Sequence, residues 1–228
     1  MPGASERVWV VVPAYNEAAV VSATLGELLR SFSNIVVVDD CSTDGTGALA
    51  LQAGAHVARH PINLGAGAAM ATGVAYVLRR GAEAIITFDA DGQHSVDDAR
   101  AMLKLLDEAG VDVVLGSRFM GQVEGITVGR RLLLKAAVVF TRLTTGLPLS
   151  DTHNGLRVFS RHAAQTIQVR QNRMAHGSEI LEQIATHKLR YVEAPCRVVY
   201  TDYSRAKGQR WTGAFAILGD LLKRKLYR

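Results

Sequence analysis

Residues 85–94 read Ile85-Ile86-Thr87-Phe88-Asp89-Ala90-Asp91-Gly92-Gln93-His94, an apolar run that ends in two carboxylates spaced two residues apart. The apolar residues predict a buried strand, and side chains two apart in an extended chain point to the same side. Asp89 and Asp91 should therefore direct two oxygen ligands at one point beyond the strand. Two such carboxylates repel each other unless a cation lies between them, and Mg²⁺ or Mn²⁺ that also binds substrate phosphates fits this role. Gly92 allows a turn there, and Gln93 adds an oxygen.

A second interpretation is that Asp89 and Asp91 only cap the helix predicted to begin at Ser95, because aspartate is common where a strand turns into a helix. Three further polar clusters follow predicted strands, namely Pro13–Glu17 (PAYNE), Asp39–Thr46 (DDCSTDGT) and Gly116–Arg118 (GSR). Turn and cap chemistry can explain each cluster alone. Four polar clusters along one edge of one sheet favour a binding site.

The pattern of apolar residues predicts an α/β fold. Near-continuous Val/Ile runs, typical of buried parallel strands, alternate with segments of helical periodicity. Strands are expected over 7–13, 34–39, 55–60, 83–88 and 111–116, and helices over 17–30, 43–53, 65–80 and 95–108. Further on we expect a basic amphipathic helix (128–145), a strand (155–159), a helix (176–187), a strand (191–200) and a terminal amphipathic helix (211–227). This order predicts a mostly parallel central sheet with helices on both faces and ligands at the carboxyl ends of the strands.

Composition narrows the class of protein. A chain of 228 residues that is 48% hydrophobic can bury a sizeable core, and it shows no repeat or linker, so we expect one domain over 1–228. The net charge of +5 is concentrated towards the end of the chain, which suggests a polyanionic partner. Few aromatic residues accompany these cations, so no nucleic-acid partner is expected. Two cysteines make neither a disulfide framework nor a zinc site, and no apolar run is long enough for a signal peptide or a membrane span.

Five motifs together give a more specific identification: VVPAYNE (11–17), VVVDDCSTDGT (36–46), NLGAGAAMATG (63–73), FDADGQH (88–94) and GSRF (116–119). In this order they resemble family 2 glycosyltransferases of the GT-A fold, which is Rossmann-like. The chain is most similar to the group of dolichol-phosphate-mannose synthases and bacterial polyprenyl-phosphate sugar transferases. The resemblance covers about residues 7–210. It implies a nucleotide-sugar half over about 7–118 and an acceptor and membrane-interface half over about 119–228.

The resemblance also implies a role for each matching position. The nucleotide-sugar donor would be held by Pro13, Ala14, Tyr15, Glu17, Asp40, Gly67 and Asp89, and by Arg205 and Lys207 in a loop that closes over it. The divalent metal, Mg²⁺ or Mn²⁺, would be bound by Asp89, Asp91 and Gln93. The catalytic positions would be Asp91, Arg118, Asp151 and Glu179, and the acceptor phosphate would be bound by Arg118, Arg130 and Arg131.

The glycines at 65 and 67 allow a competing interpretation, because Gly65-x-Gly67 is part of a dinucleotide-binding fingerprint. That fingerprint needs a third Gly or Ala and follows the first strand of its unit, whereas here Met70 holds the third position after the third strand. Close helix–sheet packing and approach of the backbone to the nucleotide explain these glycines better. We therefore do not expect a Rossmann oxidoreductase.

The chemical nature of the acceptor decides which side chains matter. A sugar hydroxyl needs a carboxylate base, which would make Asp151 or Glu179 essential. A lipid phosphate, whose second pKa is roughly 6, is already largely dianionic and needs cations to position it. Each acid also has a plain structural interpretation, Asp151 as half of an ion pair with Arg157 and Glu179 as an ordinary helix-start residue. In the functional interpretation Arg157 pairs with Asp151 or with a phosphate.

The helix predicted over 128–145 suits an enzyme that meets its acceptor at a bilayer, because its apolar residues could lie in the membrane interface. The alternative is an ordinary core helix with snorkelling Lys135 and Arg142. The sequence thus predicts a metal-dependent inverting transferase that moves a hexose from a UDP- or GDP-sugar to a polyprenyl phosphate. It would be cytoplasmic and peripheral on the inner face of the membrane, held by its own surface or by a small membrane protein. Transfer to a soluble saccharide or other hydroxyl acceptor, and a non-catalytic binding module, remain the alternatives.

Overall fold

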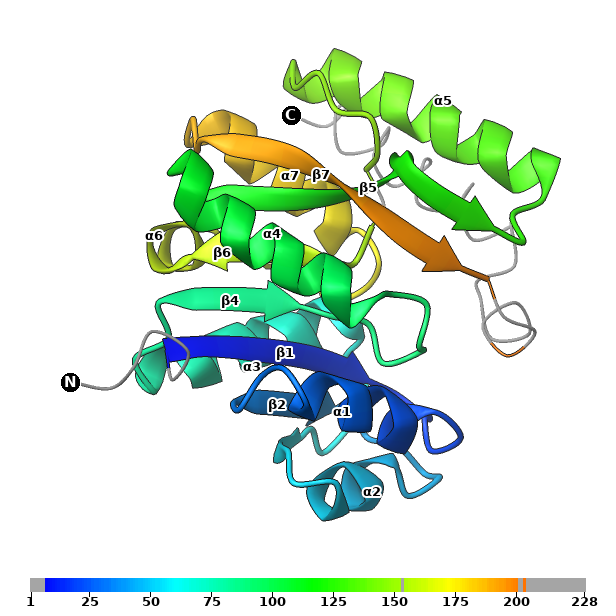
Figure 1. Cartoon of the computed structure of the whole chain (residues 1–228), viewed down its shortest axis with the longest axis vertical. Coiled ribbons are helices and arrows are strands. Elements are labelled where there is room, and N and C mark those ends of the chain that lie inside the picture. The colour runs from blue at the N-terminus through cyan, green and yellow to red at the C-terminus, as the bar shows by residue number, and fades with distance from the viewer. Residues whose placement is uncertain (1–6, 153, 201–202, 204–228) are drawn as a thin grey trace.

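The central feature of the fold is one seven-stranded sheet, seen in the computed structural model, which describes residues 7–152, 154–200 and 203 (Figure 1). Its strands are β1 (Val8–Ala14), β2 (Ile35–Asp39), β3 (His56–Arg59), β4 (Ala84–Thr87), β5 (Val113–Glu124), β6 (Arg157–Ser160) and β7 (Tyr191–Val199). The strand order is β3-β2-β1-β4-β6-β5-β7. Every neighbouring pair is parallel except those that involve β6, which runs antiparallel to both β4 and β5.

Helices cover both faces of this sheet (Figure 1). One layer contains α1 (Val21–Leu29), α2 (Thr46–Gln52) and α4 (Val96–Ala109), and the other contains α3 (Ala66–Arg79), α6 (Arg161–Thr166) and α7 (His176–Thr186). Alternate residues of a strand supply the two cores: Val10 packs with the first layer and Val11 with the second. The predicted α/β class, with a mostly parallel sheet between two layers of helices, is confirmed.

Helix α5 (Val128–Thr145) differs from the others, because only Val138 and Thr141 among its residues are buried. It begins with Thr127 as a side-chain cap, ends at Gly146 in the left-handed conformation, and packs against α7. The predicted bounds of this helix are confirmed. No helix within the described residues is both long enough and apolar enough to cross a bilayer.

The structure corrects four sequence-based expectations. The strand predicted to end at Gly116 continues to Glu124, because its later residues pair with β7 beyond a register shift, so Gly116–Arg118 lies within β5 and not after it. The strand near 155–159 is antiparallel, and the short helix α6 that follows it was not predicted. Helices α1 and α2 begin later than expected, because the residues before them form the connected loops described below.

Candidate functional site

The loops after β1 and β2 form one hydrogen-bonded unit at the carboxyl edge of the sheet. The backbone N–H groups of Asn16 and Glu17 donate to the hydroxyls of Ser42 (2.9 Å) and Thr46 (2.8 Å). The Asn16 side chain in turn accepts from the N–H of Thr43 (2.9 Å). Asn16 adopts a left-handed φ of 52°, which asparagine tolerates better than most residues. These bonds fix the predicted donor-binding loops relative to each other.

The residues expected to hold the donor base and ribose lie at this edge. Pro13 and Ala14 end β1, and Tyr15 is exposed just beyond. Glu17 is buried, and its carboxylate accepts a hydrogen bond from the hydroxyl of Tyr203 (2.8 Å). Tyr203 thus places one described residue of the C-terminal region against the donor side of the site, a contact that the sequence did not reveal.

Asp40 organises the neighbouring loop. Its buried carboxylate lies 2.7 Å from Nδ1 of His60 and accepts hydrogen bonds from the N–H groups of Leu64 (2.9 Å) and Gly65 (2.7 Å). Both oxygens are therefore engaged within the protein. This geometry supports a role for Asp40 in shaping the donor-side loop.

The structure gives a different reason for the glycines of the third motif. A Cβ on Gly67 would lie 1.9 Å from the backbone carbonyl oxygen of Gln171, and the N–H of Ala68 donates to Asn172 (3.1 Å). The close helix–sheet packing predicted for this motif occurs at Gly73, where a Cβ would lie 2.3 Å from Val11. The contact seen for Gly67 is with the loop before α7.

The loop predicted to bind the metal, residues 88–94 and called the metal-binding loop below, lies between β4 and α4. Gly92 makes the predicted turn with a φ of 72°. The cap of α4 is Ser95, whose side chain accepts from the N–H of Asp97, so Asp89 and Asp91 do not cap this helix. Asp91 instead accepts hydrogen bonds from the backbone N–H of Gln93 (3.1 Å) and from its side-chain amide. The interpretation of the two aspartates as mere helix caps is therefore wrong.

The electrostatics of the two aspartates differ. Burial raises the pKa of Asp91 to about 6, helped by the negative charge of Asp89. For Asp89, burial acts in the same direction but is outweighed by the hydrogen bond with His94 (3.1 Å) and the charge of Arg157, which lower its pKa. The surroundings of Asp91 therefore disfavour its negative charge, and a cation bound beside Asp91 would stabilise the charged carboxylate.

The donor set suits Mg²⁺ or Mn²⁺, since two carboxylates and an amide are hard oxygen ligands. Among the described residues, no group of three or more His, Cys, Asp and Glu side chains forms a metal cage. Magnesium is commonly bound by one or two carboxylates together with substrate phosphates, so the pair Asp89 and Asp91 meets that pattern. Gln93 stands beside them with its amide nitrogen turned to Asp91.

Gly155 lies against the carboxylate of Asp89, and a prediction follows from this contact. A Cβ at residue 155 would lie 2.1 Å from Oδ2 of Asp89, while the carbonyl of Gly155 accepts from the hydroxyl of Thr87 (2.7 Å). Gly155→Ala should displace the half-exposed Asp89 carboxylate without unfolding the protein. We expect Mn²⁺ affinity, measured by calorimetry, to fall about tenfold or more, a loss of about 1.4 kcal/mol or more.

Gly129→Ala on α5 is the matched control, because a Cβ there meets no atom within 4 Å. It should bind Mn²⁺ like the wild type. Unchanged Mn²⁺ affinity in Gly155→Ala would show that the position of Asp89 does not depend on this glycine.

The acceptor side of the site is built around a buried ion pair. Nε of Arg118 lies 2.6 Å from Oδ2 of Asp151, and the backbone N–H of Arg118 donates to the same oxygen (3.0 Å). Oδ1 of Asp151 accepts from the N–H of Thr152 (2.8 Å). Arg118 also donates to the hydroxyl of Tyr200 (2.6 Å), and the guanidinium of Arg130 lies 4.6 Å from the centre of the Tyr200 ring. Two of the three arginines predicted to bind the acceptor phosphate therefore meet at one tyrosine.

One predicted contact is corrected here, and the contacts of Glu179 are defined. Asp151 is paired with Arg118 and not with Arg157, because the lengthened β5 brings Arg118 to the loop before β6. The carboxylate of Glu179 accepts hydrogen bonds from the N–H groups of Arg170 (2.9 Å) and Gln171 (2.8 Å). Glu179 thus anchors the loop before α7. Arg131 is exposed on α5, and Arg205, Lys207 and the predicted terminal helix lie outside the described residues.

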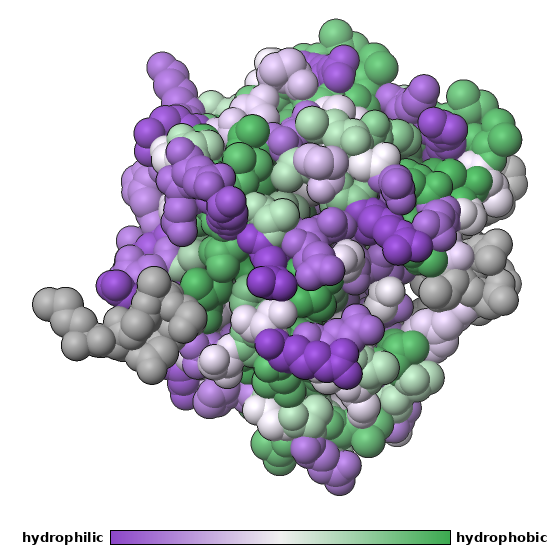
Figure 2. All heavy atoms as spheres, viewed as in Figure 1, coloured by the Kyte–Doolittle hydropathy of each residue, from purple (hydrophilic) through white to green (hydrophobic). Residues whose placement is uncertain are grey.

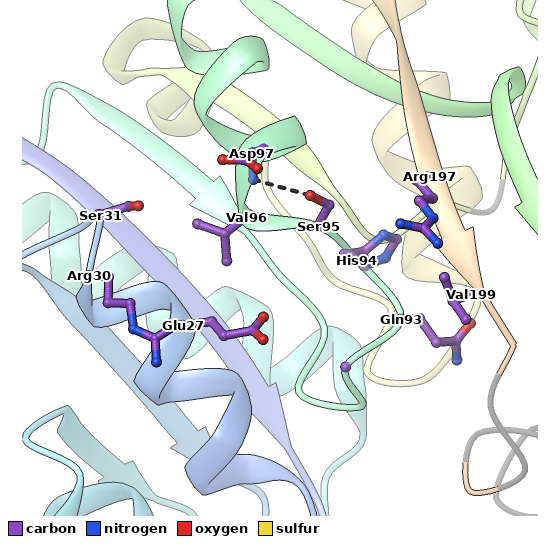
Figure 3. Close-up of a pocket in the computed structure, with 11 residues that line it drawn as sticks. Glu27, Arg30, Ser31, Gln93, His94, Ser95, Val96, Asp97, Arg197 and Val199 are labelled. Atoms are coloured by element: carbon purple, nitrogen blue, oxygen red, sulfur yellow. Dashed lines mark hydrogen bonds between the residues drawn. The ribbon is translucent and has the colours of Figure 1, made fainter.

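A separate hollow of about 410 Å³ lies behind the metal-binding loop (Figure 3). The end of α1, the start of α4 and the end of β7 line it, and Gln93, His94 and Arg197 project from these walls. The N–H of Val199 donates to the carbonyl of Gln93 (3.1 Å), which joins the end of β7 to the metal-binding loop. Residues 92–94 of the loop line the hollow, but Asp89 and Asp91 do not.

Comparison with known proteins shows the family and the fold of this chain. The model for glycosyl transferase family 2 matches residues 9–168. A UDP-N-acetylglucosamine–dolichyl-phosphate N-acetylglucosaminyltransferase of Methanococcus voltae is 29% identical, over 98% of this chain and 98% of its own. An undecaprenyl-phosphate mannosyltransferase of Micrococcus luteus is 30% identical, over 88% of this chain and 87% of its own. A glucosyl-3-phosphoglycerate synthase from Mycobacterium tuberculosis, solved with Mn²⁺, UDP-glucose and phosphoglyceric acid, shares the fold with a TM-score of 0.67 at 18% identity, over 98% of this chain and 85% of its own.

Proposed function

Because this chain belongs to glycosyl transferase family 2, and is therefore a glycosyltransferase, we propose that it transfers a hexose from a UDP- or GDP-sugar to a polyprenyl phosphate. The reaction uses Mg²⁺ or Mn²⁺ and takes place at a membrane surface. The relatives from Methanococcus voltae and Micrococcus luteus, named for dolichyl phosphate and undecaprenyl phosphate, support this class of acceptor.

The observation that carries the proposal is the engagement of Asp151. A hydroxyl acceptor needs a carboxylate free to take its proton, but both oxygens of Asp151 are bound within the protein, and Glu179 holds a loop. A phosphate acceptor needs no base, because its oxygens are already ionised, and it needs cations nearby. Arg118 and Arg130, gathered at Tyr200, are those cations. The arrangement favours a lipid phosphate over a sugar hydroxyl.

The mechanism follows from these positions. An oxygen of the acceptor phosphate attacks the anomeric carbon as the bond from that carbon to the nucleoside diphosphate breaks, and attack from the opposite side inverts the configuration. Asp89 and Asp91, with Gln93, would hold the metal, which neutralises charge on the departing diphosphate when bound. Arg118 and Arg130 orient the acceptor phosphate, and the loops after β1 and β2 hold the nucleoside.

Helix α5 supplies a surface for the bilayer. Val128, Leu132, Val139 and Leu143 are all more than half exposed, and at 3.6 residues per turn they fall within about 60° of one face. Arg131 and Lys135 lie beside this apolar stripe. In Figure 2 hydrophobic and hydrophilic residues alternate along the top of the molecule, where Figure 1 places α5. Apolar anchors flanked by cations are typical of helices that lie in the interface of an anionic membrane.

This surface gives a prediction about membrane binding. Leu132→Glu and Leu143→Glu together should weaken binding to vesicles containing phosphatidylglycerol about tenfold or more, because two anchors are lost and two negative charges face anionic lipid. Co-sedimentation with vesicles measures the effect. A matched pair of changes outside α5, Leu51→Glu on α2 and Ile62→Glu in the loop after β3, alters apolar residues that are also more than half exposed, and it should leave binding unchanged. Equal loss in both double variants would contradict the role of α5.

The proposed activity is tested by incubating the purified protein with Mg²⁺ or Mn²⁺, a panel of UDP- and GDP-sugars, and a short polyprenyl phosphate. We expect a glycolipid, identified by mass spectrometry, from one donor. Metal-dependent glycosylation of a soluble saccharide with no glycolipid would instead establish the hydroxyl-acceptor alternative. Donor hydrolysis without any glycosylated product would count against both acceptors.

A further inference from the structure

Arg157 is the most unusual charged residue near the site. It opens β6, is only 4% exposed, and lies between β4 and β5, opposite Thr87 and Leu115. Within the part of the chain that the structure describes, its guanidinium makes no hydrogen bond and no ion pair. A buried charged group without partners is costly, so a native structure that keeps one needs a reason for it.

The surroundings show where this guanidinium lies. It packs against α7, since a Cβ on Gly177 would lie 3.4 Å from Nη2 of Arg157. Burial lowers the pKa of Arg157 to about 10, and the negative charges of Asp89 and Asp151 oppose this shift, so the group stays charged at neutral pH. The side chain therefore stands between the metal-binding aspartate and the acceptor-side ion pair.

Each neighbouring carboxylate has another partner within the protein. Oδ2 of Asp89 is turned to His94, and Asp151 is held by Arg118. The pairing of Asp151 with Arg157 that the sequence suggested is thus taken by another arginine. Because no described residue accepts a hydrogen bond from Arg157, its donors remain available to a bound ligand.

We propose that Arg157 binds a phosphate group of the reactants, at the point between the metal-binding loop and the Arg118–Asp151 pair. This role rests on the proposed function and adds a ligand-contacting residue to it. A guanidinium presents several donors in a planar fork that matches two oxygens of a phosphate, and burial strengthens such charge-assisted bonds. The phosphate is either the sugar-linked phosphate of the donor diphosphate or the phosphate of the polyprenyl acceptor.

The test compares Arg157→Gln and Arg157→Lys with the wild type in two binding assays. Calorimetry measures UDP or GDP in the presence of Mn²⁺, and a separate titration measures geranylgeranyl phosphate in detergent. We expect Arg157→Gln to bind one of these probes about tenfold or more weakly, with partial recovery in Arg157→Lys, which keeps the charge but not the fork. If only the affinity for the nucleoside diphosphate falls, Arg157 binds the phosphate of the donor. If only the affinity for the prenyl phosphate falls, Arg157 binds the phosphate of the acceptor.

Thermal unfolding separates this role from a structural one. Since Arg157 has no described hydrogen bond to lose, Arg157→Gln should melt at the same temperature as the wild type or higher. Arg161→Gln is the matched control, because Arg161 lies just past the other end of β6 and donates to the carbonyl of Ala82 (2.7 Å). That variant should lose stability and keep both affinities.

Two results would overturn the inference. Unchanged affinity for both probes in Arg157→Gln would show that no reactant phosphate contacts it, while the proposed function would stand. A lowered melting temperature together with equal losses for both probes would assign Arg157 a structural role. If the wild type bound neither probe, the proposed function would fail, and the role of Arg157 would fail with it.

Discussion

Asp91→Asn should reduce sugar transfer by about 10²- to 10³-fold or more, which is the range seen when a group that stabilises developing charge is removed. Asparagine keeps the shape of Asp91 and its bond to the N–H of Gln93 but not the negative charge that attracts a divalent cation. The measurement is the rate of glycolipid formation at saturating Mn²⁺, together with Mn²⁺ affinity by calorimetry. Both should fall.

The same substitution should not destabilise the metal-free protein. Burial and the charge of Asp89 raise the pKa of Asp91 to about 6, so the folded state binds this proton more tightly than the unfolded chain does. The stabilising contribution of the protonated form is therefore present below the unfolded pKa of about 3.9 and is lost as pH rises through about 6. At pH 7 in chelator, the variant should melt at or above the temperature of the wild type.

Asp97→Asn provides the control for Asp91→Asn. Asp97 belongs to the same loop-to-helix region, but its side chain is 89% exposed and faces Arg100 on α4. It should keep full transfer activity and Mn²⁺ affinity. If Asp91→Asn retained wild-type turnover, the loop after β4 would not be the metal site.

The arrangement of the loop over residues 88–94, proposed to bind the metal, could be predicted because its signal is local. An apolar strand, two aspartates, a glycine and a glutamine lie within ten residues, and the structure needs only one turn at Gly92 to bring them together. The bounds of α5 were equally accessible, since Thr127 begins it and Gly146 ends it. For the first half of the chain, alternating strands and helices also predicted the parallel sheet, although not the order of its strands.

The acceptor side could not be read in the same way, because its contacts depend on the path of the chain. Arg118 meets Asp151 only because β5 runs past Gly116 and β6 returns antiparallel between β4 and β5. A strand of four residues such as β6 carries no signal of its direction. Along the chain Arg157 is much closer than Arg118 to Asp151, so the sequence suggested Arg157 as the partner of Asp151. In the folded protein the partner is Arg118.

The contacts of the glycines were a second feature that the sequence did not reveal. Gly67 lies in a motif that suggested contact with the nucleotide, and the structure shows that its lack of a Cβ leaves room for the carbonyl of Gln171, more than a hundred residues away. Gly155, which carried no special signal, lies against the carboxylate of Asp89. A glycine is required where another part of the chain occupies the space that a Cβ would fill. Which part of the chain lies there is known only from the folded structure.

Asp151→Ala should destabilise the protein by about 3–5 kcal/mol, the usual cost of leaving a buried charge without its partner. The side chains of Arg118 and Asp151 are only 6% and 1% exposed, so water cannot replace the lost carboxylate. Urea unfolding measures the change. Glu124→Ala breaks the exposed pair with Arg197 and serves as the control, with an expected loss of at most about 1 kcal/mol.

The double variant Asp151→Ala/Arg118→Met tests whether the stability lost in Asp151→Ala comes from the unpaired Arg118. It removes both charges, so it should recover much of the stability lost in Asp151→Ala while remaining inactive, because the acceptor phosphate has lost Arg118. A general base at Asp151 would leave the same buried arginine without its partner, so the stability change tests the ion pair and the identity of the product tests the acceptor. An unstable Asp151→Ala that is rescued by Arg118→Met supports a buried pair that positions Arg118, whereas unchanged stability in Asp151→Ala would contradict that pair.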